Sequence, residues 1–487
     1  MNKFGIASIL LPVILGSCSV ERDTREKPNV VFILTDQWRA SSLGYTGNNV
    51  VKTPNIDRFA RESVNFTNAV SVCPVCTPYR ASLITGRYPT STGMFLNDIY
   101  LPSEENCMAE IFGAEGYNTA YIGKWHLDGH GREDNVDPVR RQGFDFWKGL
   151  ECSHDYNNMP YYENDDPEKK YREDYSTFAE SKDARDYLEM HANDKSPFLL
   201  FVSFGTPHFP HHSAPQEYKD MYPYSSLDLY PNVPDSLKDH VLKELQGYYA
   251  HCTATDKAIG DIISKIDALG LSENTIVVFT SDHGEMMGSH GRLPFRKQLA
   301  WNESAHVPFL IRLPGIDKQP GATVNAPLST PDILPSLLGL SDIKIPESIE
   351  GSDLSAMIEA PDPNTDRAAL FMNVCPFDIN YPDKEYRAIR TKQYTYARTP
   401  EGPFMLFDNT IDPYQLNNLL DKPEFSDLQK YLDKKLDEQL SSIDDANFKP
   451  REYYLKKWGL ELNEHHIIEY RSIPGQTNPV CSPKLQF

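Results

Sequence analysis

Short apolar runs rich in β-branched residues alternate along this chain with segments of helical periodicity. Each run ends in polar residues, which is typical of a buried strand in a parallel sheet. Helical patterns lie between them, for example at 53–63 and 256–270. This alternation predicts an α/β fold, with a large doubly wound, mostly parallel sheet flanked by helices. The apolar runs cover residues 28–38, 118–127, 196–210 and 274–285.

The polar residues at the ends of these runs are expected to share one site. In a doubly wound sheet, the carboxyl ends of the strands open onto a common crevice. Side chains separated by about 250 residues of sequence therefore meet there. The residues in question are Asp36, Gln37, Lys124, His126, His208, Asp282 and His283.

The last quarter of the chain has a different pattern. Proline and turn residues at 361–366 indicate a linker. Apolar runs that follow it predict a smaller antiparallel sheet, and 425–443 has the periodicity of a helix. We therefore predict a catalytic α/β domain at 28–365 and a C-terminal α+β subdomain with a tail at 366–487.

The amino terminus predicts export. Residues 1–17 have a short basic start and an apolar run too short for a confident membrane span, which is typical of a signal peptide. The run ends in "LGSC", which resembles a bacterial lipobox, so Cys18 would carry the lipid and 18–27 would form a tether. We expect a periplasmic, outer-membrane or cell-surface lipoprotein that meets the membrane only through its anchor. The alternative is an ordinary secretory signal with an incidental cysteine.

Charge and cysteine content narrow the function further. The formal net charge of −21 argues against nucleic acid as a partner. It does not exclude an anionic substrate, because a few cations in a cleft outweigh a distant negative surface. Of the eight cysteines, the six other than Cys18 and Cys76 are scattered without zinc-finger spacing, and no disulfide pairing follows from the sequence.

Cys73 and Cys76 lie three residues apart in "SVCPVCTPYRASLITG". A redox pair requires a lowered thiol pKa, and Pro74 between the two cysteines makes this a weak interpretation. A zinc clip requires a second ligand pair, and none lies nearby in the sequence. A third interpretation starts from the pattern of Cys76, Pro78 and Arg80 followed by "ASLITG".

This pattern resembles the signature of the formylglycine-dependent (type I) sulfatases, which belong to the alkaline phosphatase-like superfamily. The segments "PNVVFILTDQ", "GKWH", "TPHFP", "SDHGE" and "LFDNTIDPYQLNNL" resemble the same family, in the expected order. The resemblance implies that a formylglycine-generating enzyme reads Pro78 and Arg80 and oxidises Cys76 to an aldehyde. A hydroxyl of the hydrated aldehyde would attack sulfur, and Arg80 would hold the modified residue. Tyr79 is a departure, because many members have serine or alanine there.

The resemblance also implies one metal ion. Asp36, Gln37, Asp282 and His283 would bind Ca²⁺ together with converted residue 76, since calcium accepts amide and carboxylate oxygens in irregular geometry. Many relatives have aspartate in place of Gln37, so the site here would carry less negative charge. His283 is alternatively a hydrogen-bonding neighbour of the ion. Without the resemblance, these residues are simply polar strand ends.

The remaining catalytic residues follow from the same resemblance. Lys124 and Lys297 would bind sulfate oxygens, although Lys297 is alternatively a surface lysine. His126 would contact the hydrated aldehyde and remove a proton as sulfate leaves. His208 would act as general acid toward the leaving alcohol, because histidine titrates near working pH, and Lys297 could share this role.

The substrate is expected to be a sulfated carbohydrate, because the chain looks like an exported glycan sulfatase of the Bacteroidota. The polar and aromatic loop 151–162 suits a sugar, and weakly resembles enzymes that act on galactose or N-acetylgalactosamine sulfates of host or algal glycans. His154, Asp155 and His290 are candidates for binding sugar hydroxyls. Alternatively, His154 and Asp155 lie in a surface turn, and His290 packs within its loop.

Two other functions remain open at this stage. A phosphate mono- or diester hydrolase of the same superfamily would generally have serine or threonine as nucleophile and often two zinc ions. A non-catalytic lipoprotein that binds sulfated glycans would retain an unmodified Cys76. The signature around Cys76 and the two lysines favour the sulfatase.

Overall fold

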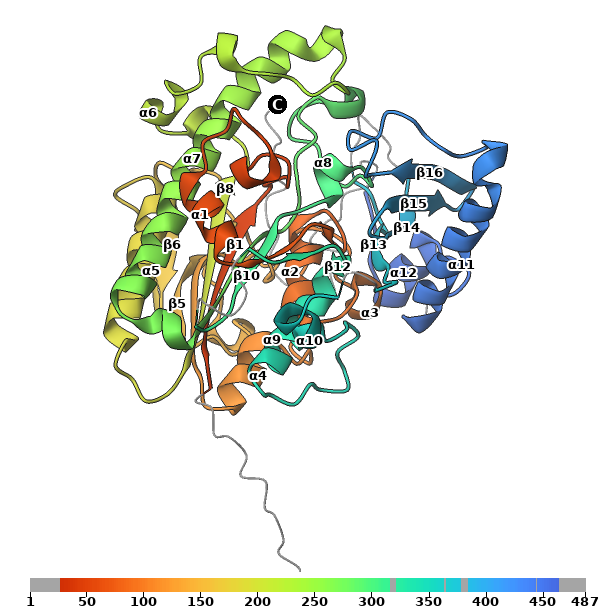
Figure 1. Cartoon of the computed structure of the whole chain (residues 1–487). Coiled ribbons are helices and arrows are strands. Elements are labelled where there is room, and N and C mark those ends of the chain that lie inside the picture. Colours follow the sequence, from red (N-terminus) through yellow and green to blue (C-terminus); the bar gives the residue numbers. More distant parts are fainter. Residues whose placement is uncertain (1–26, 316–320, 363–364, 378–383, 444, 464–487) are drawn as a thin grey trace, which may run out of the picture.

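The computed structural model describes residues 27–315, 321–362, 365–377, 384–443 and 445–463 (Figure 1). The predicted signal peptide, Cys18 and the tether up to residue 26 lie outside these ranges and stay predictions. Within the described ranges, no helix has the length and apolar character needed to cross a membrane.

A sheet of ten strands forms the centre of the molecule. Its strands are β1 (Asn29–Asp36), β2 (Val64–Phe66), β4 (Asn118–Lys124), β5 (Phe146–Leu150), β6 (Pro160–Glu163), β7 (Asp166–Tyr171), β8 (Phe198–Pro207), β9 (Thr275–Ser281), β10 (Phe309–Arg312) and β11 (Thr323–Val324). Their order is β11-β2-β10-β9-β1-β8-β4-β5-β6-β7. The five strands from β9 to β5 are parallel, whereas β10, β6 and β7 pair antiparallel with their neighbours. The predicted parallel core is confirmed, and the antiparallel strands extend it on both sides.

The apolar sequence of β1 is explained by burial on both of its faces. Val30, Phe32 and Leu34 enter one hydrophobic cluster, and Val31 and Ile33 enter another. Because successive strand side chains point to opposite faces, a strand with helices on both sides needs apolar residues at every position.

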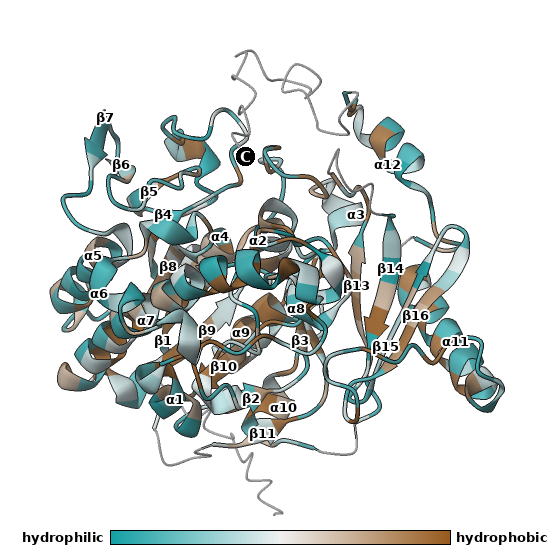
Figure 2. Cartoon of the chain, turned by 90° about the horizontal axis from the view of Figure 1, so that it is seen from above, coloured by the Kyte–Doolittle hydropathy of each residue, from teal (hydrophilic) through white to brown (hydrophobic). Residues whose placement is uncertain are grey.

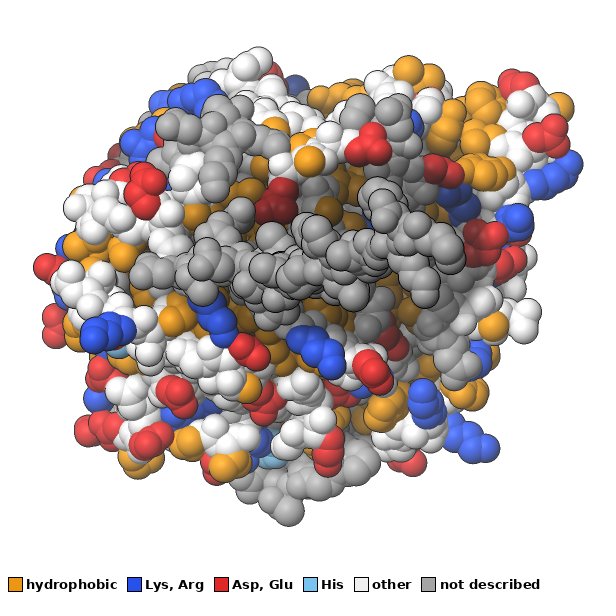
Figure 3. Space-filling view, turned by 60° about the horizontal axis from the view of Figure 1, so that its bottom comes forward, with side chains coloured by type: hydrophobic (Ala, Val, Ile, Leu, Met, Phe, Trp, Pro, Cys, Tyr) orange, Lys and Arg blue, Asp and Glu red, His pale blue; other side chains and the backbone are white. Residues whose placement is uncertain are grey.

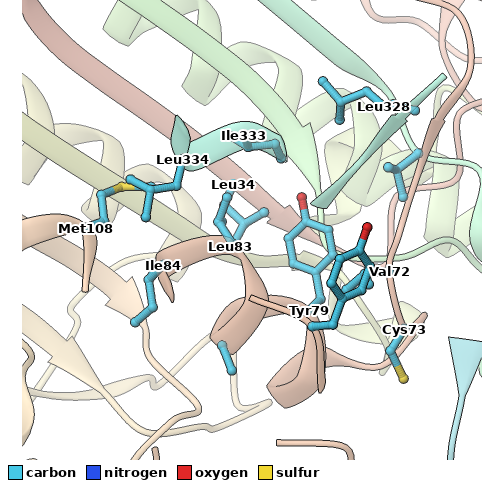
Figure 4. Close-up of a cluster of buried hydrophobic side chains, with 14 of the residues drawn as sticks. Leu34, Val72, Cys73, Tyr79, Leu83, Ile84, Met108, Leu328, Ile333 and Leu334 are labelled. Atoms are coloured by element: carbon cyan, nitrogen blue, oxygen red, sulfur yellow. The ribbon is translucent and has the colours of Figure 1, made fainter. Parts of the chain in front are cut away.

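Helices cover both faces of the sheet (Figure 1). In Figure 4, Leu34 of β1 lies in one hydrophobic cluster with Leu83 and Ile333, which belong to helices on one face of the sheet. The helix predicted at 256–270 is the second half of α7, which begins at Lys238. One layer consists of α1 (Pro54–Arg61), α5 (Ser176–His191) and α7 (Lys238–Ala268). The other consists of α2 (Cys76–Thr85), α4 (Met108–Ala114) and α9 (Ile333–Leu340).

A separate antiparallel sheet of four strands lies at one side of this domain (Figure 1 and Figure 2). It consists of β13 (Ala369–Asn373), β14 (Tyr386–Arg390), β15 (Tyr394–Thr399) and β16 (Gly402–Asp408). One face packs on Val70, Ala300 and Ala305 of the large domain. The other face is covered by α11 (Ser426–Ser442) through Leu432 and Leu436. The sheet predicted after the linker is confirmed, while the exact boundary at 365/366 stays a prediction.

Short elements complete the described structure. They are β3 (Ala69–Val70), β12 (Leu328–Ser329), α3 (Pro89–Thr92), α6 (Gln216–Lys219), α8 (Asn302–Ala305), α10 (Ser355–Glu359) and α12 (Arg451–Trp458). On the face shown in Figure 3, acidic and basic side chains are intermixed.

We predict that Gly123→Ala destabilises the protein through a clash between β4 and β8. Gly123 has φ +101°, and a Cβ there would lie 2.1 Å from the backbone oxygen of Ser203. Gly116→Ala is the matched control, because Gly116 has φ +88° but no atom within 4 Å of a Cβ. Both variants are strained, so urea denaturation should show about 2–3 kcal/mol more loss for Gly123→Ala. Equal losses would contradict the close approach of the two strands.

Candidate active site

Cys76 lies at the start of a helix that is buried along its whole length. It is the first residue of α2, and the extended Val75 precedes it. Four central strands bring polar side chains to this helix end, because the carboxyl ends of parallel strands meet at one edge of a sheet. The strand ends carry Asp36 (β1), Lys124 (β4), His208 (after β8) and Asp282 (after β9).

A buried set of four side chains has the character of a metal site. One ligand atom from each of Asp36, Cys76, Asp282 and His283 lies within 4.8 Å of the others. His283 Nε2 is 3.2 Å from Cys76 Sγ and 3.5 Å from the Oδ1 atom of each aspartate. Its Nδ1–H donates to the backbone oxygen of Gly284 at 2.9 Å, which leaves the Nε2 lone pair directed at the set. Two carboxylates and an oriented imidazole therefore fit a divalent cation.

Gln37 adjoins this set. Its backbone is left-handed, with φ 66°, and its N–H donates to Asp282 Oδ1 at 3.0 Å. The side-chain amide donates to Glu285, and its oxygen accepts from Lys297 Nζ at 3.3 Å. The Gln37 oxygen is therefore oriented by Glu285 and held beside the lysine.

Two cations neutralise the buried carboxylates. Lys124 Nζ donates to Asp36 Oδ2 at 2.6 Å and lies 3.9 Å from Cys76 Sγ. Arg80, one helical turn after Cys76, bridges Asp36 and Asp282 at 3.3 Å each. Burial alone would raise the pKa of Asp36, but Lys124 and its other cationic neighbours hold that pKa well below the ordinary value. Asp36 is therefore ionised at neutral pH.

The guanidinium of Arg80 also positions the end of β4. It donates at 2.8 Å to the backbone oxygen of Lys124 and at 2.7 Å to Ser203 Oγ. Ser203 was not predicted as a site residue. Its only signal in the sequence is a polar position inside the apolar run 196–210.

Lys297 and His208 form a second contact beside Cys76. Lys297 Nζ lies 3.5 Å from Cys76 Sγ and 3.1 Å from His208 Nε2. His208 Nδ1–H donates to the Phe209 backbone oxygen at 2.8 Å, so Nε2 accepts from the lysine. Burial and the Lys297 charge lower the pKa of His208 well below its ordinary value. The neutral His208 imidazole therefore faces Lys297 as a hydrogen-bond acceptor.

His126 is held by an acidic partner that sequence reasoning missed. Its Nε2 contacts Asp98 Oδ1 at 2.9 Å, and Arg132 donates to Asp98 Oδ2 at 2.8 Å. Burial would raise the pKa of Asp98, but Arg132 and His126 keep it far below the ordinary value. His126 Nδ1 is buried without a hydrogen-bond partner among the described residues. The backbone oxygen of His126 accepts from Thr77 Oγ1 at 2.9 Å, next to Cys76.

The three predicted sugar-binding residues are placed differently. The His154 ring stacks on His208, with centroids 4.4 Å apart, so it belongs to the site. Asp155 is exposed in a turn that its backbone oxygen closes with Asn158. His290 stacks on Trp301 at 4.6 Å, which directs its ring into loop packing. The structure therefore brings His154, but not Asp155 or His290, against the residues around Cys76.

Cys152 is a further neighbour that the sequence did not reveal. It is buried, and its Sγ lies 3.7 Å from His154 Nε2. Burial would raise the pKa of its thiol, but Lys124 and His154 lower it to about 6. Cys152 therefore places a thiol with a lowered pKa next to His154.

Comparison with known proteins agrees with this geometry. The sulfatase family profile matches residues 28–343, and that of the N-sulphoglucosamine sulphohydrolase C-terminal region matches 288–442. An ulvan-active sulfatase of Formosa agariphila is 66% identical, over 95% of this chain and 91% of its own. An endo-4-O-sulfatase of Bacteroides thetaiotaomicron is 32% identical, over 86% of this chain and 93% of its own.

Solved structures show the same architecture. One from work on glycosaminoglycan metabolism by Bacteroides thetaiotaomicron has a TM-score of 0.78 at 30% identity, and covers 89% of this chain and 99% of its own. The fold and the buried site thus define an α/β enzyme of the sulfatase type. The chain belongs to the sulfatase family and is a sulfuric ester hydrolase.

We predict that Asp98→Ala lowers kcat for a sulfate ester by about 10-fold to 100-fold, because the His126 ring loses the partner that orients it. Asp98→Asn retains a hydrogen-bonding group and should lose less activity. Asp427→Ala serves as control, since this carboxylate is 99% exposed on α11. Steady-state kinetics that place Asp98→Ala at the level of the control would contradict an orienting role.

Proposed function

We propose that this enzyme removes sulfate from an acidic polysaccharide, with an ulvan-type algal glycan as the first candidate. The observation that carries the proposal is the position of Cys76 Sγ, 3.2 Å from His283 and 3.5 Å from Lys297 within a sulfatase signature. The 66% identical relative, which is named for its activity on ulvan, supports the choice of substrate. Galactose or N-acetylgalactosamine sulfate remains the second candidate.

We propose that Cys76 is converted to formylglycine, whose hydrate supplies the attacking hydroxyl. Sγ here occupies the place of that oxygen. Every residue of α2 is buried, so the signature is inaccessible to a maturation enzyme in the folded protein, and conversion must precede folding. Tyr79, the departure from the usual signature, has its ring in the hydrophobic cluster of Figure 4. Its bulk therefore packs into the core rather than against residue 76.

We propose one calcium ion on Asp36, Gln37, Asp282, His283 and residue 76. Oxygen donors from carboxylate, amide and hydrated aldehyde suit calcium, with His283 as the less usual nitrogen ligand. When bound, the ion would supply positive charge that stabilises the developing negative charge on the sulfuryl group.

The protein's own side chains divide the remaining chemistry. Lys124 and Lys297 flank residue 76 at 3.9 and 3.5 Å from Sγ, where their charges bind the oxygens of a sulfate ester. Lys297 Nζ and His208 Nε2 lie 3.1 Å apart beside residue 76, so the pair can deliver a proton to the leaving alcohol. His126 offers its unpartnered Nδ1 as a proton acceptor when sulfate is released.

Matured wild-type protein should release sulfate from sulfated ulvan oligosaccharides, and Cys76→Ala should not. The assay measures free sulfate over a panel of ulvan, galactose and N-acetylgalactosamine sulfates, with phosphate mono- and diesters included. Preferred hydrolysis of phosphate esters, or turnover that survives in Cys76→Ala, would overturn the proposal. Binding without any hydrolysis by matured protein would instead support a non-catalytic glycan-binding protein.

His208→Ala should impair sugar sulfates far more than nitrophenyl sulfate, because only the poor leaving group needs a proton. We expect kcat/KM to fall about 100-fold to 10,000-fold for the sugar ester. His191→Ala, at the end of α5, is a control for histidine removal. Equal losses of His208→Ala on both substrates would remove the proton-transfer role of the pair.

Calcium should raise the thermal unfolding midpoint of chelator-treated protein, because an ion that binds only the folded state stabilises it by about 2.7 kcal/mol at 100 times its Kd. The rise should be much smaller in Asp282→Asn and unchanged in Asp155→Asn. Full activity in a demonstrably metal-free sample would contradict the calcium site.

A further inference from the structure

A cavity of about 770 Å³ lies apart from the candidate active site, between the large domain and the four-stranded sheet. None of the residues predicted for catalysis, metal binding or sugar binding lines it. Its walls come from the segments 40–46, 65–68, 302–308, 390–393 and 409–414, together with Tyr230 and Asn325. Its volume is in the range of known small-ligand sites, which are about 300–1,000 Å³.

The cavity wall contains a buried arginine without an ionic partner. Arg390, in β14, is only 4% exposed. It donates through Nε to Asn68 Oδ1 at 2.8 Å and through Nη1 to Asn302 Oδ1 at 2.6 Å. Both amides are neutral, as is Thr395, whose Oγ1 accepts from Nη1 at 3.5 Å, and no carboxylate within the described ranges forms an ion pair with Arg390. Burial lowers the pKa of Arg390 to about 10, with no negative charge to offset the effect.

Arg387, on the same strand, is a buried arginine that has an ionic partner. It is fully buried and pairs with Asp445, which is also fully buried. A buried charge is costly unless it is paired, and Arg387 receives its counter-charge from Asp445 in the segment after α11. Arg390 receives none from the described chain and faces the cavity instead. An anion from outside the chain would complete its pairing.

The rest of the lining suits a sugar. Tyr230 and Tyr414 are neighbours in the wall, with ring centroids 5.3 Å apart and ring planes tilted by 56°. Arg39 stacks on the Tyr230 ring at 4.2 Å, so Tyr414 is the ring that offers contact to a pyranose. Lys392 adds a second positive charge at the rim. The acidic lining residue, Glu303, already accepts from Asn232 at 2.6 Å. Six carboxamides line the cavity, and they are Asn65, Asn68, Asn302, Asn325, Gln393 and Asn409. All but the first also form side-chain hydrogen bonds within the protein, so hydroxyls can bind Asn65 and the remaining donor and acceptor positions of the others.

The helix α8 separates this cavity from the metal set. Asn302 and Glu303 of α8 line the cavity, while the backbone oxygen of Ser304 accepts from Gly284 N at 2.8 Å. Gly284 follows His283 directly. The two sites are therefore distinct but share a four-residue helix as a common wall.

We propose that this cavity is a second binding site for an acidic saccharide, whose sulfate or carboxylate group pairs with Arg390 and whose hydroxyls bind the carboxamides. A polysaccharide with a negative group on successive residues supplies such a ligand. The site would hold polymer independently of the sulfate ester at residue 76. Sulfate and uronate carboxylate offer the same charge, so the test uses one probe of each kind.

Binding is measured by calorimetry in the Cys76→Ala background, so the result does not depend on turnover. The probes are a sulfated galactan oligosaccharide without uronic acid, an unsulfated oligogalacturonate, and a neutral galactan oligosaccharide. Arg390→Gln should weaken binding of at least one anionic probe about tenfold, and the probe affected identifies the anion. Lys392→Ala should weaken the same probe at least threefold, and Tyr414→Ala should do so too.

Lys434→Ala on α11 is the matched control, because Lys434 is exposed and does not line the cavity. Lys392 is exposed as well, so its variant remains informative if Arg390→Gln fails to fold. The proposal would be overturned if Lys392→Ala and Tyr414→Ala bound both anionic probes as tightly as Lys434→Ala does. It would also be overturned if these variants lost as much affinity for the neutral probe as for the anionic probes.

Discussion

The site depends on one buried ionic bridge, in which Arg80 joins the carboxylates of Asp36 and Asp282. These residues lie on α2, at the end of β1 and after β9, so a single guanidinium fixes three elements around residue 76. The two carboxylates are tolerated in this interior because Arg80 and Lys124 pair with them. Removal of one partner from a buried pair of this kind costs about 3–5 kcal/mol. The same charges that stabilise the crevice thus make it ready for a cation and a sulfate ester.

The pairing of buried charges also differs between the candidate active site and the cavity beside the four-stranded sheet. Around Cys76, positive and negative side chains are matched, apart from the excess that an anionic substrate would use. In the small sheet, Arg387 is matched by Asp445. Arg390 is buried without such a match, and it is this imbalance that distinguishes the second cavity from ordinary domain packing.

Much of this arrangement could be predicted from sequence, for a clear physical reason. Apolar strands with polar carboxyl ends specify a parallel sheet, and such a sheet specifies where Asp36, Lys124 and Asp282 meet. Sequence patterns do not predict contacts that depend on loop geometry. Asp98 orients His126 from a loop with no distinguishing pattern, and His290 follows "SDHGE" closely in sequence but turns onto Trp301. The second cavity could not be foreseen, because Asn68, Asn302 and Arg390 meet only when the small sheet docks.

Peptide mass spectrometry of residue 76 in active, purified protein tests the central claim most directly. Our account predicts that the tryptic peptide containing this position carries an aldehyde, in a proportion that follows specific activity from one preparation to the next. A fully active preparation whose peptide has only an unmodified thiol at position 76 would contradict it.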